Sequence, residues 1–226
     1  MLRIYSRIPT TNLPVAKALS RLIQSYIYHH LPPREHEGLK HTSGKVFKRM
    51  NFDFNFRSGV LEIRFRAYER ALEEQVALAV LKEGLKLGEI HLADTSVAVE
   101  EHRVEVGKVQ LKGCVACAVQ GLLGHKIYLE PQDSRHLEML KRNALERFET
   151  LTCKAYEGVF EMALKWQQLD KPRHFYYGNN KSPIKAWPAR WEIEAAPEFI
   201  NVMLDTGVGS GCMNAGVGFL EVVGKG

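Results

Sequence analysis

The order of two hydrophobic periodicities in the N-terminal half constrains the fold of this chain more than any other feature. Residues 14–30 and 68–83 place apolar side chains three or four positions apart, which is the period of an amphipathic helix. Four segments alternate apolar and polar side chains with the period of a β-strand, namely residues 2–8, 46–56, 60–67 and 90–99. The resulting order, β-α-β-β-α-β, is that of a ferredoxin-like unit.

Proline and glycine mark the expected ends of these segments. Pro14 suits the first turn of a helix, and Pro32-Pro33 ends that helix because proline cannot donate a backbone hydrogen bond. Residues 57–59, Arg-Ser-Gly, are predicted to form the turn between two strands, and Gly84 lies near the expected end of the second helix. The positions of these proline and glycine residues therefore agree with the helix and strand ends that the periodicity predicts.

The C-terminal half has the pattern of a looser copy of the same unit. A helix is predicted at residues 133–151, and residues 157–168 fit a helix or a strand. Strands are predicted at residues 109–120, 126–129, 173–177, 189–194, 199–204 and 217–223. We therefore expect an α+β protein of two tandem ferredoxin-like (RRM-like) domains, residues 1–103 and 104–226, with the boundary near residues 101–107.

Composition excludes several classes of protein. Hydrophobic residues make up 45% of the 226 residues and charged residues 25%, which is ordinary globular usage and argues against disorder. No apolar run approaches the roughly 20 residues of a membrane span, and the first residues lack the apolar block of a secretion signal. Four cysteines in a chain of this length do not indicate a disulfide scaffold. A cytoplasmic protein without membrane contact is expected.

Positive charge is concentrated in two segments. Residues 40–70 contain eight Lys or Arg and three Asp or Glu. The net charge of this segment, +5, equals that of the whole chain. Residues 171–191 contain five bases and no acid. This distribution suits a polyanionic partner, although solvated faces opposite acidic neighbours would give the same pattern.

The second basic segment also carries aromatic residues. Phe175-Tyr176-Tyr177 and Trp187 alternate with cationic side chains. Aromatic rings stack on bases while cations contact phosphates, so this composition favours contact with single-stranded RNA. The alternative is a hairpin around residues 178–180 whose aromatic side chains face the core.

A glycine-rich segment at residues 207–218 demands unusual backbone conformations or close backbone packing. The dinucleotide fingerprint G-x-G-x-x-G fails at each starting glycine, and no Gly-Lys-Ser/Thr of a P-loop is present. The pattern therefore does not indicate a familiar nucleotide site, and a long bulged hairpin is the simplest alternative.

The spacing of Gly207, Gly209, Gly216 and Gly218, followed by Phe219 at the start of a strand, resembles the glycine-rich loop of the repeat-associated (RAMP) superfamily. Within that superfamily it is similar to the CRISPR repeat-RNA processing endoribonucleases. The resemblance implies two tandem ferredoxin-like domains, a glycine-rich loop against RNA, and cleavage of CRISPR precursor transcripts without metal or other cofactor. Its implied partners are CRISPR repeat RNA and, as an alternative assembly, a CRISPR effector complex, with the chain a monomer or a homodimer.

RNA can be cut without metal when its own 2′-hydroxyl attacks the adjacent phosphate, provided that a base, an acid and a cation are near. The polar loop predicted at residues 34–44 leads into a region that holds these groups. By resemblance, His41 is the main proton-transfer residue, with the general acid as its expected role in the family's arrangement. Lys45 stabilises the phosphate, and Lys48 is the alternative residue for that role. Tyr26 or Tyr28 is the candidate base. The expected RNA contacts are Lys48, Arg49, Arg64, Arg66, Arg173, Lys181, Lys185, Gly207, Gly209, Gly216 and Gly218.

The function expected is a metal-independent endoribonuclease that leaves a 2′,3′-cyclic phosphate. One alternative is a non-catalytic RNA-binding subunit of a CRISPR effector complex, and another is an enzyme acting on a small molecule. At the residue level, His41 can also be an ordinary loop residue and Tyr26 a core residue. Cys114 and Cys117 form a lone Cys-x-x-Cys in apolar surroundings, which predicts a buried strand rather than a zinc site.

Overall fold

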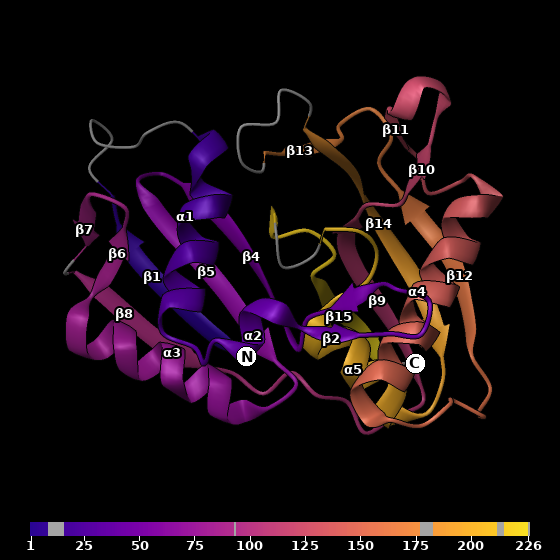
Figure 1. Ribbon diagram of the computed structural model, residues 1–226, viewed down its shortest axis with the longest axis horizontal. Helices are drawn as coiled ribbons and strands as arrows, with labels where there is room; N and C mark the ends of the chain where they lie inside the picture. Colours follow the sequence, from indigo (N-terminus) through magenta and orange to yellow (C-terminus); the bar gives the residue numbers. More distant parts are fainter. Residues whose placement is uncertain (9–15, 93, 177–182, 212–214, 226) are drawn as a thin grey trace.

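The computed structural model describes residues 1–8, 16–92, 94–176, 183–211 and 215–225. Two α+β units lie side by side, the N-terminal unit in indigo to magenta and the C-terminal unit in orange to yellow (Figure 1). The chain passes from one unit to the other between β8 (Thr95–Val99) and β9 (Lys108–Val115). The predicted division at residue 103 falls in this passage and stays a prediction.

The first unit has the ferredoxin-like order of elements. These are β1 (Leu2–Arg7), α1 (Ala16–His29), β4 (Met50–Arg57), β5 (Val60–Ala67), α3 (Arg70–Glu83) and β8 (Thr95–Val99). The strands form an antiparallel sheet of order β4-β5-β1-β8. Ser58 and Gly59 both adopt positive φ in the β4–β5 turn, as the predicted Arg-Ser-Gly turn requires. The ferredoxin-like prediction for this half is confirmed.

Additional short elements decorate this unit and were not predicted. The predicted polar loop at residues 34–44 instead contains α2 (Arg34–Glu37) and β2 (Leu39–Lys40), and β2 pairs with β3 (Val46–Phe47). β6 (Leu85–Leu87) pairs with β7 (Ile90–Leu92), so the predicted strand at 90–99 is divided in two. Strands of two or three residues are too short to leave a periodic signal.

The second unit repeats the same order of elements. These are β9 (Lys108–Val115), α4 (Ser134–Thr152), β12 (Glu161–Gln167), β14 (Ile184–Glu194), α5 (Pro197–Thr206) and β15 (Leu220–Lys225). Its sheet has the order β12-β14-β9-β15, and β13 (Arg173–Phe175) pairs with β14. A small hairpin of β10 (Ala118–Gln120) and β11 (Lys126–Tyr128), with the 3₁₀ turn η1 (Leu122–Gly124), precedes α4. The tandem ferredoxin-like fold is therefore confirmed.

The strand predicted at residues 199–204 is wrong, because this segment is helix α5. The helix is apolar nearly all round since it lies between its own sheet and strands β4 and β5 of the first unit. A helix buried on all sides shows no polar face and so resembles a buried strand in sequence. Pro197 in its first turn was the available helix signal. The ambiguous segment at 157–168 contains a strand, β12.

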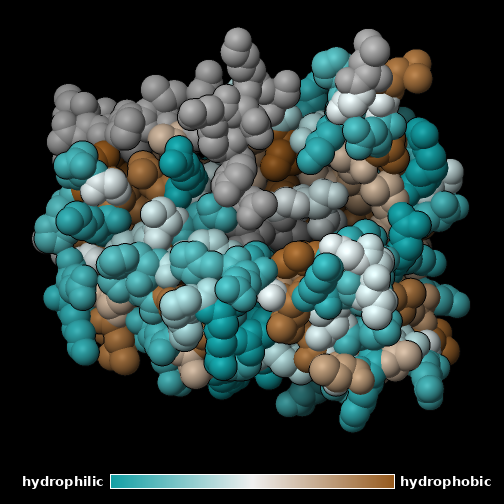
Figure 2. Space-filling model, in the orientation of Figure 1, coloured by the Kyte–Doolittle hydropathy of each residue, from teal (hydrophilic) through white to brown (hydrophobic). Residues whose placement is uncertain are grey.

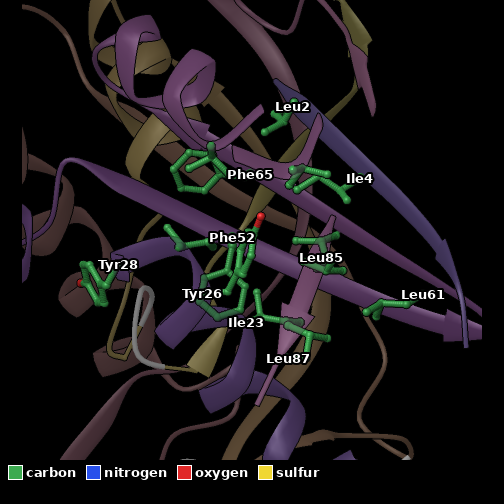
Figure 3. Close-up of a cluster of buried hydrophobic side chains, with 14 of the residues drawn as sticks. Leu2, Ile4, Ile23, Tyr26, Tyr28, Phe52, Leu61, Phe65, Leu85 and Leu87 are labelled. Atoms are coloured by element: carbon green, nitrogen blue, oxygen red, sulfur yellow. The ribbon is translucent and has the colours of Figure 1, made fainter. Parts of the chain in front are cut away.

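Each unit has its own hydrophobic core. The first is built from β1, α1, β4 and β5, with Ile4, Ile23 and Phe65 at most 1% exposed (Figure 3). The second surrounds Trp191 and Phe199, which are fully buried. Among the described helices, none combines the length and hydrophobicity that a bilayer crossing requires. The face seen in Figure 2 is mostly hydrophilic, with separate hydrophobic patches.

Candidate active site and RNA interface

The hairpin of β2 and β3 carries His41 and Lys45 at its tip. The amide of His41 donates to the carbonyl of Lys45 at 2.8 Å, and the amide of Gly44 donates to the carbonyl of His41 at 2.9 Å. Gly44 adopts a φ of 83°, which closes the turn. The purple segment that contains β2 reaches away from its own sheet to helix α4 of the second unit (Figure 1). The two candidate residues therefore lie where the two units meet.

The ring of His41 is held on both sides. Its Nδ1 accepts a hydrogen bond from the backbone amide of Ser43 at 3.1 Å and lies 2.8 Å from the Ser43 hydroxyl. Because Nδ1 accepts from an amide, the proton of the neutral ring sits on Nε2. Nε2 lies 3.4 Å from a carboxylate oxygen of Glu149 on α4. The nitrogen available to a ligand is thus Nε2.

Lys45 and Phe47 attach the same hairpin to α4. The ammonium of Lys45 lies 2.5 Å from the carboxylate of Glu146. Phe47 is 3% exposed, and the guanidinium of Arg147 lies 4.9 Å from its ring centroid. Arg147 also donates to the carbonyl of Thr206 at 2.9 Å. A buried aromatic contact and an ion pair therefore fix the position of the hairpin tip.

A cleft of about 550 Å³ opens between this hairpin, α4 and the start of the glycine-rich segment. Its walls include the cations Lys45, Lys48 and Arg142. Ser210, which is exposed, and Gly211 form the opposite wall. An oxyanion such as a phosphodiester entering here would meet cationic side chains from both units.

Tyr26 lies in the core of the first unit rather than at this cleft. It is 6% exposed and is surrounded by apolar side chains such as Ile23, Phe52 and Leu85 (Figure 3). Its hydroxyl donates to the carbonyl of Gly84 at 2.9 Å. Burial raises the pKa of Tyr26 to about 12, so the phenol is a poor base at neutral pH. The core interpretation therefore fits Tyr26 better than the catalytic one.

Tyr28 occupies a different position at the edge of that core (Figure 3). The ring centroid of Tyr28 lies 4.3 Å from the ring centroid of His36 and 5.8 Å from the ammonium of Lys48. Lys48 in turn donates to the carbonyl of His36. Burial lowers the pKa of Lys48. Tyr28 and Lys48 thus belong to one local cluster that borders the cleft through Lys48.

Arg49 and Arg64, which were both predicted to contact RNA, have partners inside the protein. Arg49 forms ion pairs with Glu35 and Glu69. Arg64 does the same with Asp53 and Glu221. These pairs neutralise much of the positive charge of residues 40–70.

Arg66 departs furthest from the prediction. It is 3% exposed and donates to the carbonyls of Leu204 and Leu220 of the second unit, while its guanidinium lies 4.4 Å from the ring centroid of Phe219. Burial lowers the pKa of Arg66 to about 10. Arg66 therefore joins the two units in this structure, which favours a structural role, and its predicted contact with RNA stays a prediction.

The four predicted glycines are buried, and their contacts are with protein. A Cβ on Gly207 would lie 2.2 Å from the Asn51 amide nitrogen, and one on Gly216 would lie 2.9 Å from the Phe52 ring. A Cβ on Gly209 would lie 2.6 Å from the carbonyl oxygen of Ala116. Gly218 also is buried and adopts a φ of 80°. These glycines let the segment pack between the two sheets, and Gly209 also lines the cleft together with Ser210 and Gly211. Contact of the four glycines with RNA stays a prediction.

A second groove, of about 290 Å³, lies between the sheets of the two units. It is lined by Arg173 and Arg190, and Arg190 lies 5.4 Å from the ring centroid of Trp166, which is 46% exposed. Phe175 and Trp187 are buried, so these two aromatic residues serve the core as the alternative predicted. Lys185 is exposed on β14, and Lys181 lies outside the described residues. Cations and one exposed aromatic ring therefore meet in this groove.

A family model matches the C-terminal part of the chain. Residues 122–222, which are less than half of the sequence, are similar to the family described as CRISPR associated protein Cas6, C-terminal. No protein of curated function matches the sequence.

Solved structures of Cas6 and related proteins share the fold over the full length. "CRISPR associated protein Cas6" has a TM-score of 0.69 and 16% identity, covering 99% of both chains. "An RAMP protein binding different RNA substrates" has a TM-score of 0.73 and 13% identity, covering 99% of this chain and 100% of the other. A Cas6-related protein from Pyrococcus furiosus has a TM-score of 0.71 and 14% identity, covering 100% and 99%. The predicted resemblance to repeat-processing RAMP proteins is thereby confirmed.

Several residues of this candidate site were not singled out from the sequence. Arg142, Glu146 and Glu149 lie on α4, where acids and bases alternate and only an amphipathic helix was predicted. Trp166 lies on the edge strand β12, and a large aromatic residue on an edge strand was the sequence signal for this surface. In the part of the chain that the structure describes, no group of three or more His, Cys, Asp or Glu is arranged to hold a metal ion.

Proposed function

We propose that this chain is an endoribonuclease that cuts CRISPR repeat RNA in precursor transcripts to give guide RNAs. The observation that carries the proposal is the placement of His41 and Lys45 on one hairpin, which borders a cleft through Lys45 and faces the domain that is similar to the Cas6 C-terminal family. The proposed reaction is attack of the 2′-hydroxyl on the adjacent phosphorus. The bond from phosphorus to the 5′-oxygen breaks, and the upstream product ends in a 2′,3′-cyclic phosphate.

In this proposal His41 is the general acid. In the imidazolium form that serves as the acid, Nδ1–H donates to the Ser43 hydroxyl, which lies 2.8 Å away. Nε2–H delivers its proton to the leaving 5′-oxygen once the substrate has entered, which leaves the ring neutral. Lys45 is partly exposed at the cleft and stabilises the charge that develops on the phosphate oxygens. Of the two tyrosines, Tyr28 remains the candidate base because the Tyr26 hydroxyl is engaged in the core.

The groove between the two sheets is a candidate path for RNA outside the cleft. Arg173, Lys112 and Arg190 contribute positive charge, and Trp166 offers a face on which a base can stack. Single-stranded RNA is recognised by this combination of cations and aromatic rings. The exposed Lys185 on β14 extends the same basic region.

The test is incubation of the protein with its cognate repeat RNA in excess chelator. We expect cleavage at one position, a cyclic phosphate on the upstream product, and no cleavage when the attacking nucleotide carries a 2′-deoxy sugar. Cleavage of the 2′-deoxy substrate, or loss of cleavage with chelator, would overturn the mechanism. Tight binding of repeat RNA without any cleavage would instead identify a non-catalytic RNA-binding subunit.

A further inference from the structure

Both groups proposed to act on the phosphate are already in contact with an acid. Lys45 Nζ lies 2.5 Å from Glu146, and His41 Nε2 lies 3.4 Å from Glu149. Both acids come from α4, three positions apart, so they project from the same face of the helix. One helix of the second unit therefore supplies a carboxylate to each reacting group of the first.

These carboxylates occupy the positions that the substrate needs. An RNA phosphate that uses Lys45 and His41 must approach the same two nitrogen atoms that the carboxylates contact. In each pair one side chain is exposed and the other is largely buried: Lys45 is 43% exposed and Glu146 14%, while Glu149 is 49% exposed and His41 10%. The exposed member of each pair can turn toward solvent without unpacking a core, and ion pairs at a surface contribute little free energy, which makes exchange of a carboxylate for a phosphate feasible.

The hairpin does not depend on these ion pairs for its fold. Phe47 is buried beside Arg147, and β2 pairs with β3 through Leu39↔Phe47 and Lys40↔Val46. The two acids therefore act on the side chains at the hairpin tip, while the aromatic contact anchors its base.

We propose that Glu146 and Glu149 are positioning residues that hold Lys45 and His41 on α4 before RNA binds and are displaced by the scissile phosphate. This inference rests on the proposed function. The two acids keep the reacting side chains ordered in the free protein and compete with RNA for them. Only an RNA that places a phosphate at both nitrogen atoms recovers the interaction that is lost.

The experiment measures affinity for a repeat RNA with a 2′-deoxy sugar at the cleavage position, with the full-length protein. Glu146→Gln and Glu149→Gln keep the shape of each side chain and remove its charge. We expect each to tighten binding about two- to five-fold, because the competing anion is gone. We also expect the slope of log K against log salt to steepen by about 0.7 in Glu146→Gln, which frees the Lys45 ammonium, because this is the value for one more phosphate contact on a single strand.

The matched control is Glu138→Gln. Glu138 lies on the same helix, is exposed, and forms no ion pair with any described residue. It removes the same charge without freeing a cation at the cleft, so its affinity and salt slope should stay near those of the wild type. Affinities and slopes of the two Gln variants that equal those of Glu138→Gln would overturn the proposal.

Single-turnover cleavage separates positioning from competition. Glu149→Gln retains an oxygen that accepts from His41 Nε2–H, whereas Glu149→Ala does not. We expect the cleavage rate at saturating RNA to be retained in the Gln variant and to fall several-fold in the Ala variant. Equal rates in both would contradict a positioning role. Absence of cleavage in the wild type would refute the proposed function but leave the binding comparison interpretable.

Discussion

At the scale of single residues, the surroundings of a side chain decide between chemical and structural roles. Tyr26 and His41 both belong to side-chain types suited to proton transfer, yet the Tyr26 hydroxyl is bonded inside a core, whereas His41 lies on the hairpin that borders the cleft through Lys45. A phenol whose pKa is raised to about 12 cannot exchange protons usefully near pH 7.

Replacing Tyr26 with Phe tests this distinction. The variant loses the hydrogen bond from the hydroxyl to Gly84, so the free energy of unfolding should fall by about 1 kcal/mol while the cleavage rate stays unchanged. Urea denaturation and single-turnover cleavage measure the two quantities. A cleavage rate reduced more than ten-fold in a folded Tyr26→Phe protein would return Tyr26 to the active site.

His136 gives the protein a pH dependence unrelated to catalysis. It is fully buried in α4, and burial lowers its pKa to about 4. The unfolded chain binds a proton near pH 6.5 and the folded chain does not. Stability from this group is therefore complete above about pH 6.5 and is lost as the pH falls toward 4, by at most about 3 kcal/mol.

We expect the unfolding free energy of the wild type to fall between pH 7 and pH 4.5 more steeply than that of His136→Leu. Urea denaturation at a series of pH values measures both slopes, and the other titrating groups are common to the two proteins. Parallel curves would show that His136 does not lower stability in acid.

At the scale of elements, the glycine-rich segment works as a spacer between sheets. Gly216 has a φ of 71° and faces the Phe52 ring of the other unit. The hydroxyl of Ser20 on α1 donates to the carbonyl of Ala215, also across the interface, at 3.0 Å. The family pattern of glycines is thus explained here by close packing.

Gly216→Ala should destabilise the protein more than Gly59→Ala. Both glycines have positive φ, 71° and 77°, so both substitutions strain the backbone. A Cβ at 216 would lie 2.9 Å from Phe52, whereas at 59 the nearest atom is 3.8 Å away. We expect the difference to be about 1–3 kcal/mol by urea denaturation, and equal losses would contradict the packing account.

Elements with a long periodic pattern were predictable from the sequence, and elements defined by contacts with the other unit were not. β5 was predicted with its observed bounds because one face is buried in its own sheet. α5 was mistaken for a strand because both units cover it. The β2–β3 hairpin is held by Phe47 and by partners on α4, which no local pattern encodes.

At the scale of the whole molecule, several bases of residues 40–70 are paired with acids, so this segment offers less positive charge to a partner than the sequence suggested. Of the bases in residues 40–70, Lys45, Arg49, Arg64 and Arg70 each form an ion pair with an acid. The hypothesis of solvated or paired faces therefore accounts for much of that segment. Placement of His41 and Lys45 was inferable only by resemblance, whereas their acidic partners required the structure.

The two units also share polar contacts that tie the site together. Asp205 of α5 is 1% exposed and bonds to His102 and Arg103 in the connection between the units. Arg66 joins β5 to β15 through the Leu220 carbonyl. These contacts join α5 and β15 of the second unit to the first unit and to the connection between the units.

Single-turnover cleavage of the cognate repeat RNA by His41→Ala tests the central claim most directly. The control is His125→Ala, which removes an exposed histidine on the β10–β11 hairpin. The account predicts a rate about 10²- to 10⁴-fold lower than that of the wild type for His41→Ala, with RNA affinity within about two-fold, and a wild-type rate for His125→Ala. Cleavage by His41→Ala at the wild-type rate would contradict it.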